Sequence, residues 1–152
     1  MLSPLKTQRI WLDRINIALA HSAESGDQEK YETSVDLHLR KRPDALSFRI
    51  GLEMILTPAA GAHCRYNQIS IKTVGIFELP NDTSEEYIKA VVPLNCLAIL
   101  HGFARGVVAQ ITGLNEGGPV LLPTVNFEEA LKEARAHKKP ESKPANQSEG
   151  KD

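Results

Sequence analysis

Side chains able to carry out chemistry are few in this 152-residue chain, and their spacing matches no familiar reactive site. The five histidines, at positions 21, 38, 63, 101 and 137, include no pair four residues apart, the spacing that sets two metal ligands on one helical face. His63 and Cys64 are neighbours and offer two ligands, but no companion pair accompanies them. We therefore expect no metal site and no bound cofactor.

The search for enzyme motifs gives the same result. The sequence contains no G-x-S-x-G turn for a serine nucleophile and no glycine-rich loop for phosphate groups. Glu85-Glu86 and Glu128-Glu129 each fall in the first turn of an expected helix, where carboxylates offset the helix dipole. The residues therefore favour a binding protein over an enzyme.

Composition indicates one soluble domain in a reducing compartment. Eighteen basic and nineteen acidic residues nearly cancel, so no charge excess favours nucleic acid or an anionic membrane. Two cysteines are too few for a disulfide framework, and the N-terminus lacks the pattern of a signal peptide, which indicates the cytoplasm. Residues 91–114 are largely apolar, but His101, Arg105 and Gln110 lie in their middle, so we expect no membrane insertion.

Alternating apolar residues predict four strands in the first half of the chain. The alternation changes phase at Asp13-Arg14, which predicts a bulge or a bend there. Short connections between consecutive strands predict antiparallel hairpins in one sheet, with one apolar face and one wet face. The strands are expected over residues 10–19, 35–40, 46–56 and 66–77.

The second half of the chain has the period of helices. Thr83 or Ser84 is placed to cap a short helix, and a long helix is expected over residues 94–113 before a Gly-Gly-Pro stop. Asn126 is a candidate N-cap for a final helix that begins at Phe127. The expected fold class is therefore α+β, a four-stranded antiparallel sheet followed by a long and a short C-terminal helix.

The long helix carries apolar residues around nearly its whole circumference. One small sheet covers only one side of such a helix, so a second subunit is the expected cover for the other side. A strip of mostly small residues would let another backbone come close; the alternative is that this strip packs on the chain's own sheet. The predicted interface residues are Ala98, Gly102, Arg105, Gly106 and Ala109.

The order of elements and three sequence blocks resemble the SecB family of bacterial protein-export chaperones. The similarity spans roughly residues 5–135, and it is most specific where an Ala-Arg pair and a Val-Asn-Phe segment stand at the family's spacing. The blocks are Gln8-Arg9-Ile10-Trp11, then Val74-Gly75-Ile76-Phe77, then Ala104-Arg105 with Leu121-Leu122-Pro123-Thr124-Val125-Asn126-Phe127.

This resemblance implies a SecB-like chaperone domain over residues 1–139 that assembles as a homotetramer, a dimer of dimers joined through the long helices. It also implies that unfolded polypeptide clients bind in apolar grooves, which keep them competent for translocation or folding. An alternative is that Leu122 and Phe127 only anchor the last helix to the core. The implied polypeptide-binding residues are Trp11, Ile76, Phe77, Val120, Leu121, Leu122 and Phe127.

Three positions depart from the family at the surface where it docks the translocation ATPase SecA. That surface is acidic in the export chaperone, whereas the matching positions here are Arg14, Ala18 and Ser70, so charge complementarity is lost. The alternative function is a specialised SecB-like chaperone or interaction module for a dedicated partner, such as a toxin–antitoxin pair, without delivery to SecA. Residues 140–152 are expected to form a disordered polar tail.

Overall fold

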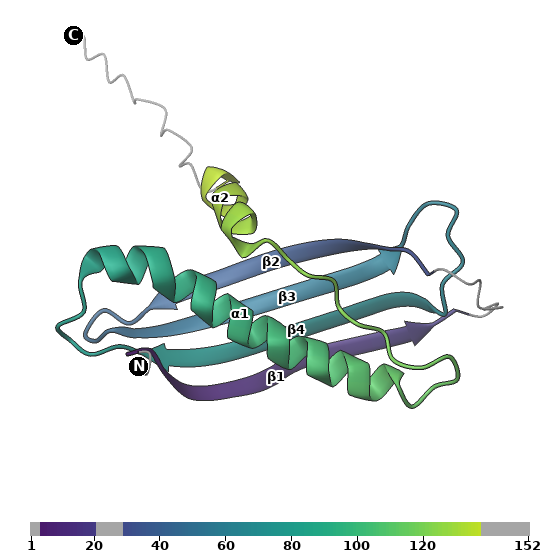
Figure 1. The fold of residues 1–152 in the computed structure, drawn as a ribbon, viewed down its shortest axis with the longest axis horizontal. Coiled ribbons are helices and arrows are strands. Elements are labelled where there is room, and N and C mark those ends of the chain that lie inside the picture. Colours follow the sequence, from purple (N-terminus) through teal and green to yellow (C-terminus); the bar gives the residue numbers. More distant parts are fainter. Residues whose placement is uncertain (1–3, 21–28, 138–152) are drawn as a thin grey trace, which may run out of the picture.

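The chain forms one antiparallel sheet with a long helix across one face and a short helix at one edge (Figure 1). The computed structural model describes residues 4–20 and 29–137, so the expected tail at 140–152 lies outside the described residues. The predicted fold class is confirmed. The elements are β1 (Lys6–Leu19), β2 (Tyr31–Lys41), β3 (Ser47–Pro58), β4 (Tyr66–Glu78), α1 (Glu85–Thr112) and α2 (Phe127–His137).

The sheet order is β1-β4-β3-β2, so the first two strands do not pair. The hairpins predicted for β2 with β3 and for β3 with β4 are confirmed, whereas β1 pairs with β4 at the opposite edge. A hairpin between β1 and β2 was therefore the wrong expectation. Residues 20–30 separate these two strands along the chain, more than the usual hairpin loop of about 2–5 residues, and β1 and β2 lie at opposite edges of the sheet.

The predicted bulge in β1 is confirmed. Asp13 is the extra residue between Leu12 and Arg14, which pair with successive residues of β4. One extra residue shifts the alternation of side chains by one position. Ile10 before the bulge and Ile15 after it therefore both pack against the core.

The face of the sheet that lies under α1, called the inner face, holds the core. Gly75 on β4 permits the close approach of the helix. A Cβ built there would lie 2.6 Å from the ring of Phe77 and 3.2 Å from Leu100. The large side chains that are fully buried include Ile50, Leu52, Met54, Leu56, Ile69, Ile71, Phe77, Leu97 and Leu100.

α1 is one continuous helix rather than the short and the long helix that the sequence predicted. Ser84 is its N-cap, with its hydroxyl accepting a hydrogen bond from the backbone N–H of Tyr87 at 3.3 Å. Pro93 lies inside the helix and is buried. A proline bends a helix without ending it when packing holds both sides, and Figure 1 shows the first turns of α1 at an angle to the rest.

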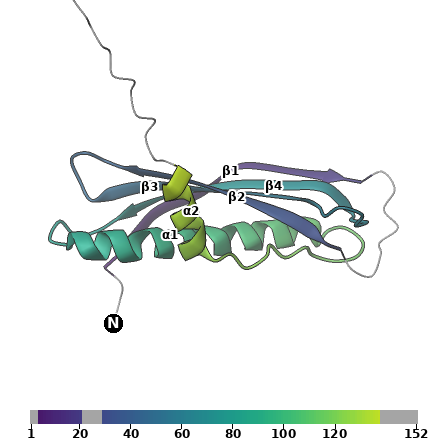
Figure 2. The ribbon, with the colours of Figure 1, turned by 90° about the horizontal axis from the view of Figure 1, so that it is seen from above.

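The opposite side of the sheet, called the outer face, is left open. Figure 2 shows α1 along one side of the sheet, and the described residues put no helix across the other. α1 is long and apolar enough to cross a membrane, but helices buried in a protein core meet the same criteria. The buried residues of α1 pack on β3 and β4. α2 lies at the β2 edge, where the Oδ1 atom of Asn126 accepts the N–H of Glu129 at 3.3 Å, as the predicted cap requires.

Candidate functional site

The side of α1 that faces away from the sheet is apolar and uncovered by the described residues. Ile99, Phe103 and Ile111 on the helix are between 37% and 39% exposed. A Cβ built on Gly102 or Gly106 would meet no atom within 4 Å. An exposed patch of this kind marks a surface that another protein covers.

The residues predicted for subunit contact lie on this exposed side. Ala98, Gly102, Arg105 and Gly106 are exposed, and Ala109 is half-buried. The alternative, in which this strip packs on the chain's own sheet, was wrong for the four exposed residues. A different stripe of α1 faces the sheet, and it consists of Val92, Pro93, Cys96, Leu97, Leu100, Ala104, Val108 and Thr112.

The connector, defined as residues 113–126, runs back from the end of α1 to α2 (Figure 1). The hydroxyl of Thr112 accepts the backbone N–H of Val120 at 2.8 Å and donates to the carbonyl of Val108 at 2.6 Å. The Nε2 atom of His101 lies 2.9 Å from the carbonyl oxygen of Pro123. Thr112 and His101 therefore tie the connector to α1, although the sequence predicted no partner for either side chain.

Held in this way, the connector buries two of its predicted binding residues and exposes the one between them. Val120 and Leu122 lie in the core, whereas Leu121 is 57% exposed. Phe127, at the start of α2, is half-buried with its ring edge-on to His101 at a centroid distance of 5.6 Å. Within the single chain, Leu121 is therefore the predicted binding residue of the connector most available to an apolar ligand.

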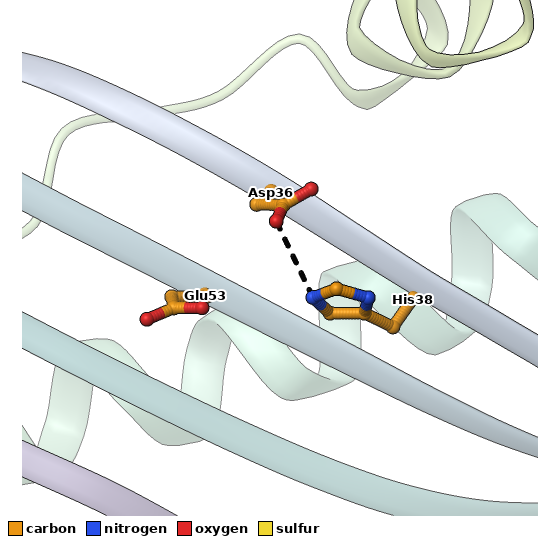
Figure 3. Close-up of side chains that lie close together, drawn as sticks. All are labelled: Asp36, His38 and Glu53. Carbon is orange, nitrogen blue, oxygen red and sulfur yellow. Dashed lines mark ion pairs between the residues drawn. The ribbon is translucent and has the colours of Figure 1, made fainter. Parts of the chain in front are cut away.

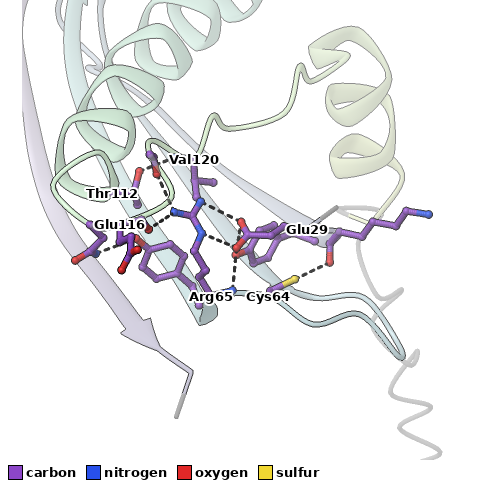
Figure 4. Close-up of polar contacts among 11 residues, drawn as sticks. Glu29, Cys64, Arg65, Thr112, Glu116 and Val120 are labelled. Carbon is purple, nitrogen blue, oxygen red and sulfur yellow. Dashed lines mark hydrogen bonds and ion pairs between the residues drawn. The ribbon is translucent and has the colours of Figure 1, made fainter. Parts of the chain in front are cut away.

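Arg65 clamps the beginning of the connector to the end of the sheet (Figure 4). Its guanidinium donates to the two carboxylate oxygens of Glu29 at 2.6 and 3.3 Å. It also donates to the carbonyl oxygens of Glu116 and Gly118 at 3.0 and 2.9 Å. Gly117 lies between them with φ at 95°, and a Cβ there would be 2.7 Å from the guanidinium. Sequence reasoning missed this clamp because its partners are far apart along the chain.

The clamp shifts the ionisation of its members. Burial alone would raise the pKa of the Glu29 carboxyl, but hydrogen bonds and charge from Arg65 outweigh it and lower this pKa below its ordinary value. The hydrogen bond to Glu29 in turn raises the pKa of Arg65. Burial and the neighbouring Glu29 charge raise the pKa of the Tyr31 hydroxyl. The pair is therefore charged across the neutral pH range.

The seven predicted polypeptide-binding residues do not share one surface of the single chain. Phe77 points inward beneath α1, where it is fully buried. Ile76 precedes it on β4 and therefore points to the outer face, as does Trp11, which pairs with Val74. The other four residues belong to the connector and the start of α2, and they are Val120, Leu121, Leu122 and Phe127.

Three potential metal ligands meet on the outer face (Figure 3). Donor atoms of Asp36, His38 and Glu53 all lie within 4.8 Å of one another. However, the Nε2 atom of His38 is 3.3 Å from Asp36, and Arg14 donates to Glu53 at 2.5 Å. These contacts make neighbouring ion pairs a better description than a cation site. Sequence reasoning missed the cluster because its members come from two different strands.

Both cysteines are buried and free. Burial raises the pKa of the Cys96 thiol to about 12. The thiol of Cys64 donates to the carbonyl oxygen of Lys30 at 3.2 Å. A buried thiol of raised pKa is a poor nucleophile, so Cys96 serves packing.

Exposed apolar surface continues beyond α1, at positions that sequence reasoning did not identify. Leu114, just after α1, is 86% exposed, and Leu19, at the end of β1, is 57% exposed. A hollow of about 590 Å³ separates α2 from the edge strand β2. A second hollow of about 530 Å³ is lined by Leu19, Ala20, Arg65, Tyr66, Asn115, Glu116 and Gly117.

The chain matches known proteins over most of its length. The family model described as preprotein translocase subunit SecB matches residues 3–138. Protein-export protein SecB from each of two strains of Acidithiobacillus ferrooxidans is 29% identical over 132 residues, which cover 84% of this chain and 87% of the relative.

A solved structure has a similar fold. It is the Mycobacterium tuberculosis Rv1957 SecB-like chaperone in complex with a ChAD peptide from the Rv1956 HigA1 antitoxin. The TM-score is 0.62 at 16% identity, over 80% of this chain and 91% of that one. SecB proteins are non-enzymatic chaperones, so the prediction of a binding protein rather than an enzyme is confirmed. Because the family model spans nearly the whole described chain, this protein belongs to the SecB family.

Proposed function

We propose that this chain is a cytoplasmic, client-holding chaperone that works as a homotetramer and keeps non-native polypeptides competent for translocation or folding. The observation that carries the proposal is the uncovered apolar side of α1, where Ile99, Phe103 and Ile111 flank the open positions of Gly102 and Gly106. Two α1 helices that meet along this glycine strip would bury that surface in a dimer of dimers.

Clients would bind on the apolar surface near the connector. Leu114 and Leu121 offer exposed side chains there, and Leu19 borders the hollow at the end of β1. β2 has one edge without a strand partner among the described residues, beside the hollow under α2. An extended client could add backbone hydrogen bonds at that edge, and non-directional apolar burial suits a chaperone that accepts many sequences.

Assembly and holding activity test the proposal together. Size exclusion with light scattering should give the mass of four chains of 16.7 kDa each. The protein should also suppress the aggregation of a thermally unfolding reporter enzyme in the absence of ATP. A monomer that leaves aggregation unchanged would refute both parts of the proposal.

The substitution Gly106→Leu separates assembly from folding. In the single chain the new side chain points into open space, so the helix should persist or gain propensity. Between two closely packed helices the same side chain would clash, so the tetramer should fall apart while the circular dichroism of the helix is retained. The control Ala136→Leu adds the same bulk at an exposed position of α2 and should leave the mass unchanged.

A charge on the connector tests client binding separately. Leu121→Asp should weaken the suppression of aggregation, because it replaces exposed apolar surface with a hydrated carboxylate, while the tetramer mass stays the same. Thr124→Asp places the same charge at another exposed connector position and is the matched control. Equal activity of Leu121→Asp and the wild type would exclude Leu121 from the client surface.

A second candidate function is that of a specialised chaperone for a dedicated partner, without delivery to SecA. It is favoured by Arg14, Ala18 and Ser70 at the docking positions, and by the bond from Arg14 that neutralises Glu53 on the same face. Titration with SecA at low ionic strength decides between the export role and the dedicated-partner role. Binding would support the export role, and persistent client holding without SecA binding would support the dedicated role.

A further inference from the structure

Three arginines form one row across the outer face of the sheet. Arg9 on β1 and Arg49 on β3 both stand opposite Ile76 on β4, and Arg40 on β2 stands opposite Arg49. All three are exposed, and none forms an ion pair with a described residue. Like charges directly opposite each other destabilise a sheet, so folding does not explain the row.

Two of these arginines are held in place by the chain's single tryptophan. The guanidinium carbons of Arg9 and Arg49 lie 5.4 and 5.1 Å from the ring centroid of Trp11. Stacking on an aromatic ring restrains the guanidinium plane. The N–H groups at its edge stay available for a bidentate bond to a carboxylate. The row is therefore oriented in advance for an anion.

The sheet is hollowed beside the arginine row. Gly51 and Val74 pair with each other between the charged side chains, and a Cβ built on Gly51 would meet only ordinary contacts, at 3.5 Å or more. The hollow measures about 520 Å³ and is lined by Asp13, His38, Arg40, Arg49, Gly51, Lys72 and Val74. Lys72 lies 3.6 Å from the Asp13 carboxylate, which leaves the charges of Arg40 and Arg49 unmatched.

The next charged row along the strands behaves differently. Arg14, Lys72, Glu53 and Asp36 face one another across the four strands. Arg14 bonds to Glu53, Lys72 pairs with Asp13 in the bulge, and Asp36 pairs with a histidine. Of these two rows, only the arginine row therefore carries unmatched positive charge, which faces the hollow next to it.

We propose that this row and hollow bind an extended, acidic segment of a protein partner. Neighbouring strands lie about 4.8 Å apart, so Arg9 stands roughly 10 Å from Arg49, with Arg40 about 5 Å beyond. An extended chain rises about 3.3 Å per residue and its alternate side chains face the same way, so carboxylates about four residues apart are separated by roughly 13 Å and can reach Arg9 and Arg40 at the two ends of the row. An apolar side chain between them would lie over Ile76 and Trp11.

Nucleic acid fits this surface less well than an acidic peptide. The chain has a formal net charge of −1, so it has no overall positive excess to attract a polyphosphate backbone. The carboxylates of Asp13, Asp36 and Glu53 lie just beyond it and would repel the next phosphates. The proposed surface also lies on the opposite side of the sheet from α1, so a partner could bind while a client is held.

A fluorescein-labelled deca-glutamate peptide tests the proposal on the full-length protein. We expect its anisotropy to rise on binding, the emission of Trp11 to change in parallel, and the affinity to fall with salt. Arg40→Gln combined with Arg49→Gln should weaken binding about tenfold. Gly51→Val, whose Cβ would make only ordinary contacts of 3.5 Å or more, adds bulk to the hollow and should weaken binding as well. Arg135→Gln on α2 removes an exposed charge elsewhere and is the control.

Binding that survives the double substitution, or that leaves the emission of Trp11 unchanged, would overturn the proposal. A single-stranded oligonucleotide of equal length that binds more tightly than the peptide would overturn it as well. Circular dichroism and light scattering on each variant check the fold and the assembly. If the double variant fails to fold, Arg40→Gln alone carries the test, since the Arg40 side chain has no interaction with a described residue.

Discussion

The two faces of the sheet come from the same four strands but are built on opposite principles. On the inner face, residues such as Ile50, Met54 and Ile71 are fully buried beneath α1, so shape and volume are fixed by packing. On the outer face, ion pairs lie beside a row of unmatched arginines, and most side chains reach water. The comparison teaches that the inner face determines stability, whereas the outer face is available for recognition.

A glycine on each face gives the sharpest test of this contrast. Gly75→Ala should destabilise the protein by about 2–3 kcal/mol, because the new Cβ would lie 2.6 Å from the buried ring of Phe77. Gly51→Ala, on the outer face of the neighbouring strand, should stay within about 0.5 kcal/mol of the wild type. Urea unfolding at one fixed protein concentration measures both, and equal effects would contradict the contrast.

The clamp at the end of the sheet should give the next largest effect. Arg65→Met leaves the Glu29 carboxylate and the carbonyls of Glu116 and Gly118 without their donor. We expect a loss of about 2 kcal/mol in the free energy of unfolding, since partly buried acceptors would remain unsatisfied. Holding activity should fall too, because the connector is tied down there. Arg135→Met, at an exposed site of α2, is the matched control and should change neither.

The same clamp predicts a dependence on pH. The pKa of Glu29 is lowered in the folded chain from its ordinary value of 4.5. Its contribution to stability is therefore full above pH 4.5 and is lost as the pH falls through the folded value. In Glu29→Gln this contribution is absent at every pH. The stability difference between wild type and variant should therefore shrink below pH 4.5, and a constant difference would contradict the lowered pKa.

Local pattern was enough to predict the strands, the caps and one irregularity. Period-two alternation located all four strands, and its change of phase at Asp13 located one of the three register shifts in β1. The caps were predicted at Thr83 or Ser84 and at Asn126 from side chains that can accept a backbone N–H, and the structure selects Ser84 for the first. The continuation of α1 through Pro93 was not predicted, because tertiary packing on both sides of a proline decides whether the helix continues.

The site was less predictable than the fold because it depends on register and on distant contacts. The exposed strip on α1 follows from helical spacing alone, so Gly102 and Gly106 could be identified from the sequence. The row formed by Arg9, Arg49 and Arg40 exists only in the order β1-β4-β3-β2, which the sequence did not reveal. The same dependence on pairing explains why Trp11 and Ile76 were grouped with residues that lie across the sheet.

A buried hydroxyl on the inner face should give a smaller change of opposite sign. The Oγ1 atom of Thr73 is buried and has no hydrogen-bond partner among the described residues. Thr73→Val keeps the shape of the side chain and removes the unsatisfied group, so stability should rise by about 1 kcal/mol. Thr57→Val on β3, where the side chain is half-exposed, is the control and should change little. A loss of stability in Thr73→Val would show that the Thr73 hydroxyl forms a stabilising hydrogen bond in the folded protein.

The smallest effect is expected from an ion pair on the outer face. Arg14 bonds to Glu53 at 2.5 Å, but the Arg14 side chain is 61% exposed, so water and salt screen the pair. Arg14→Gln should therefore lower the unfolding free energy by less than about 0.5 kcal/mol, and less still at high salt. A larger loss would mean that outer-face charges hold the fold together. A small loss would agree with an outer face whose charges contribute little to stability and remain available for recognition.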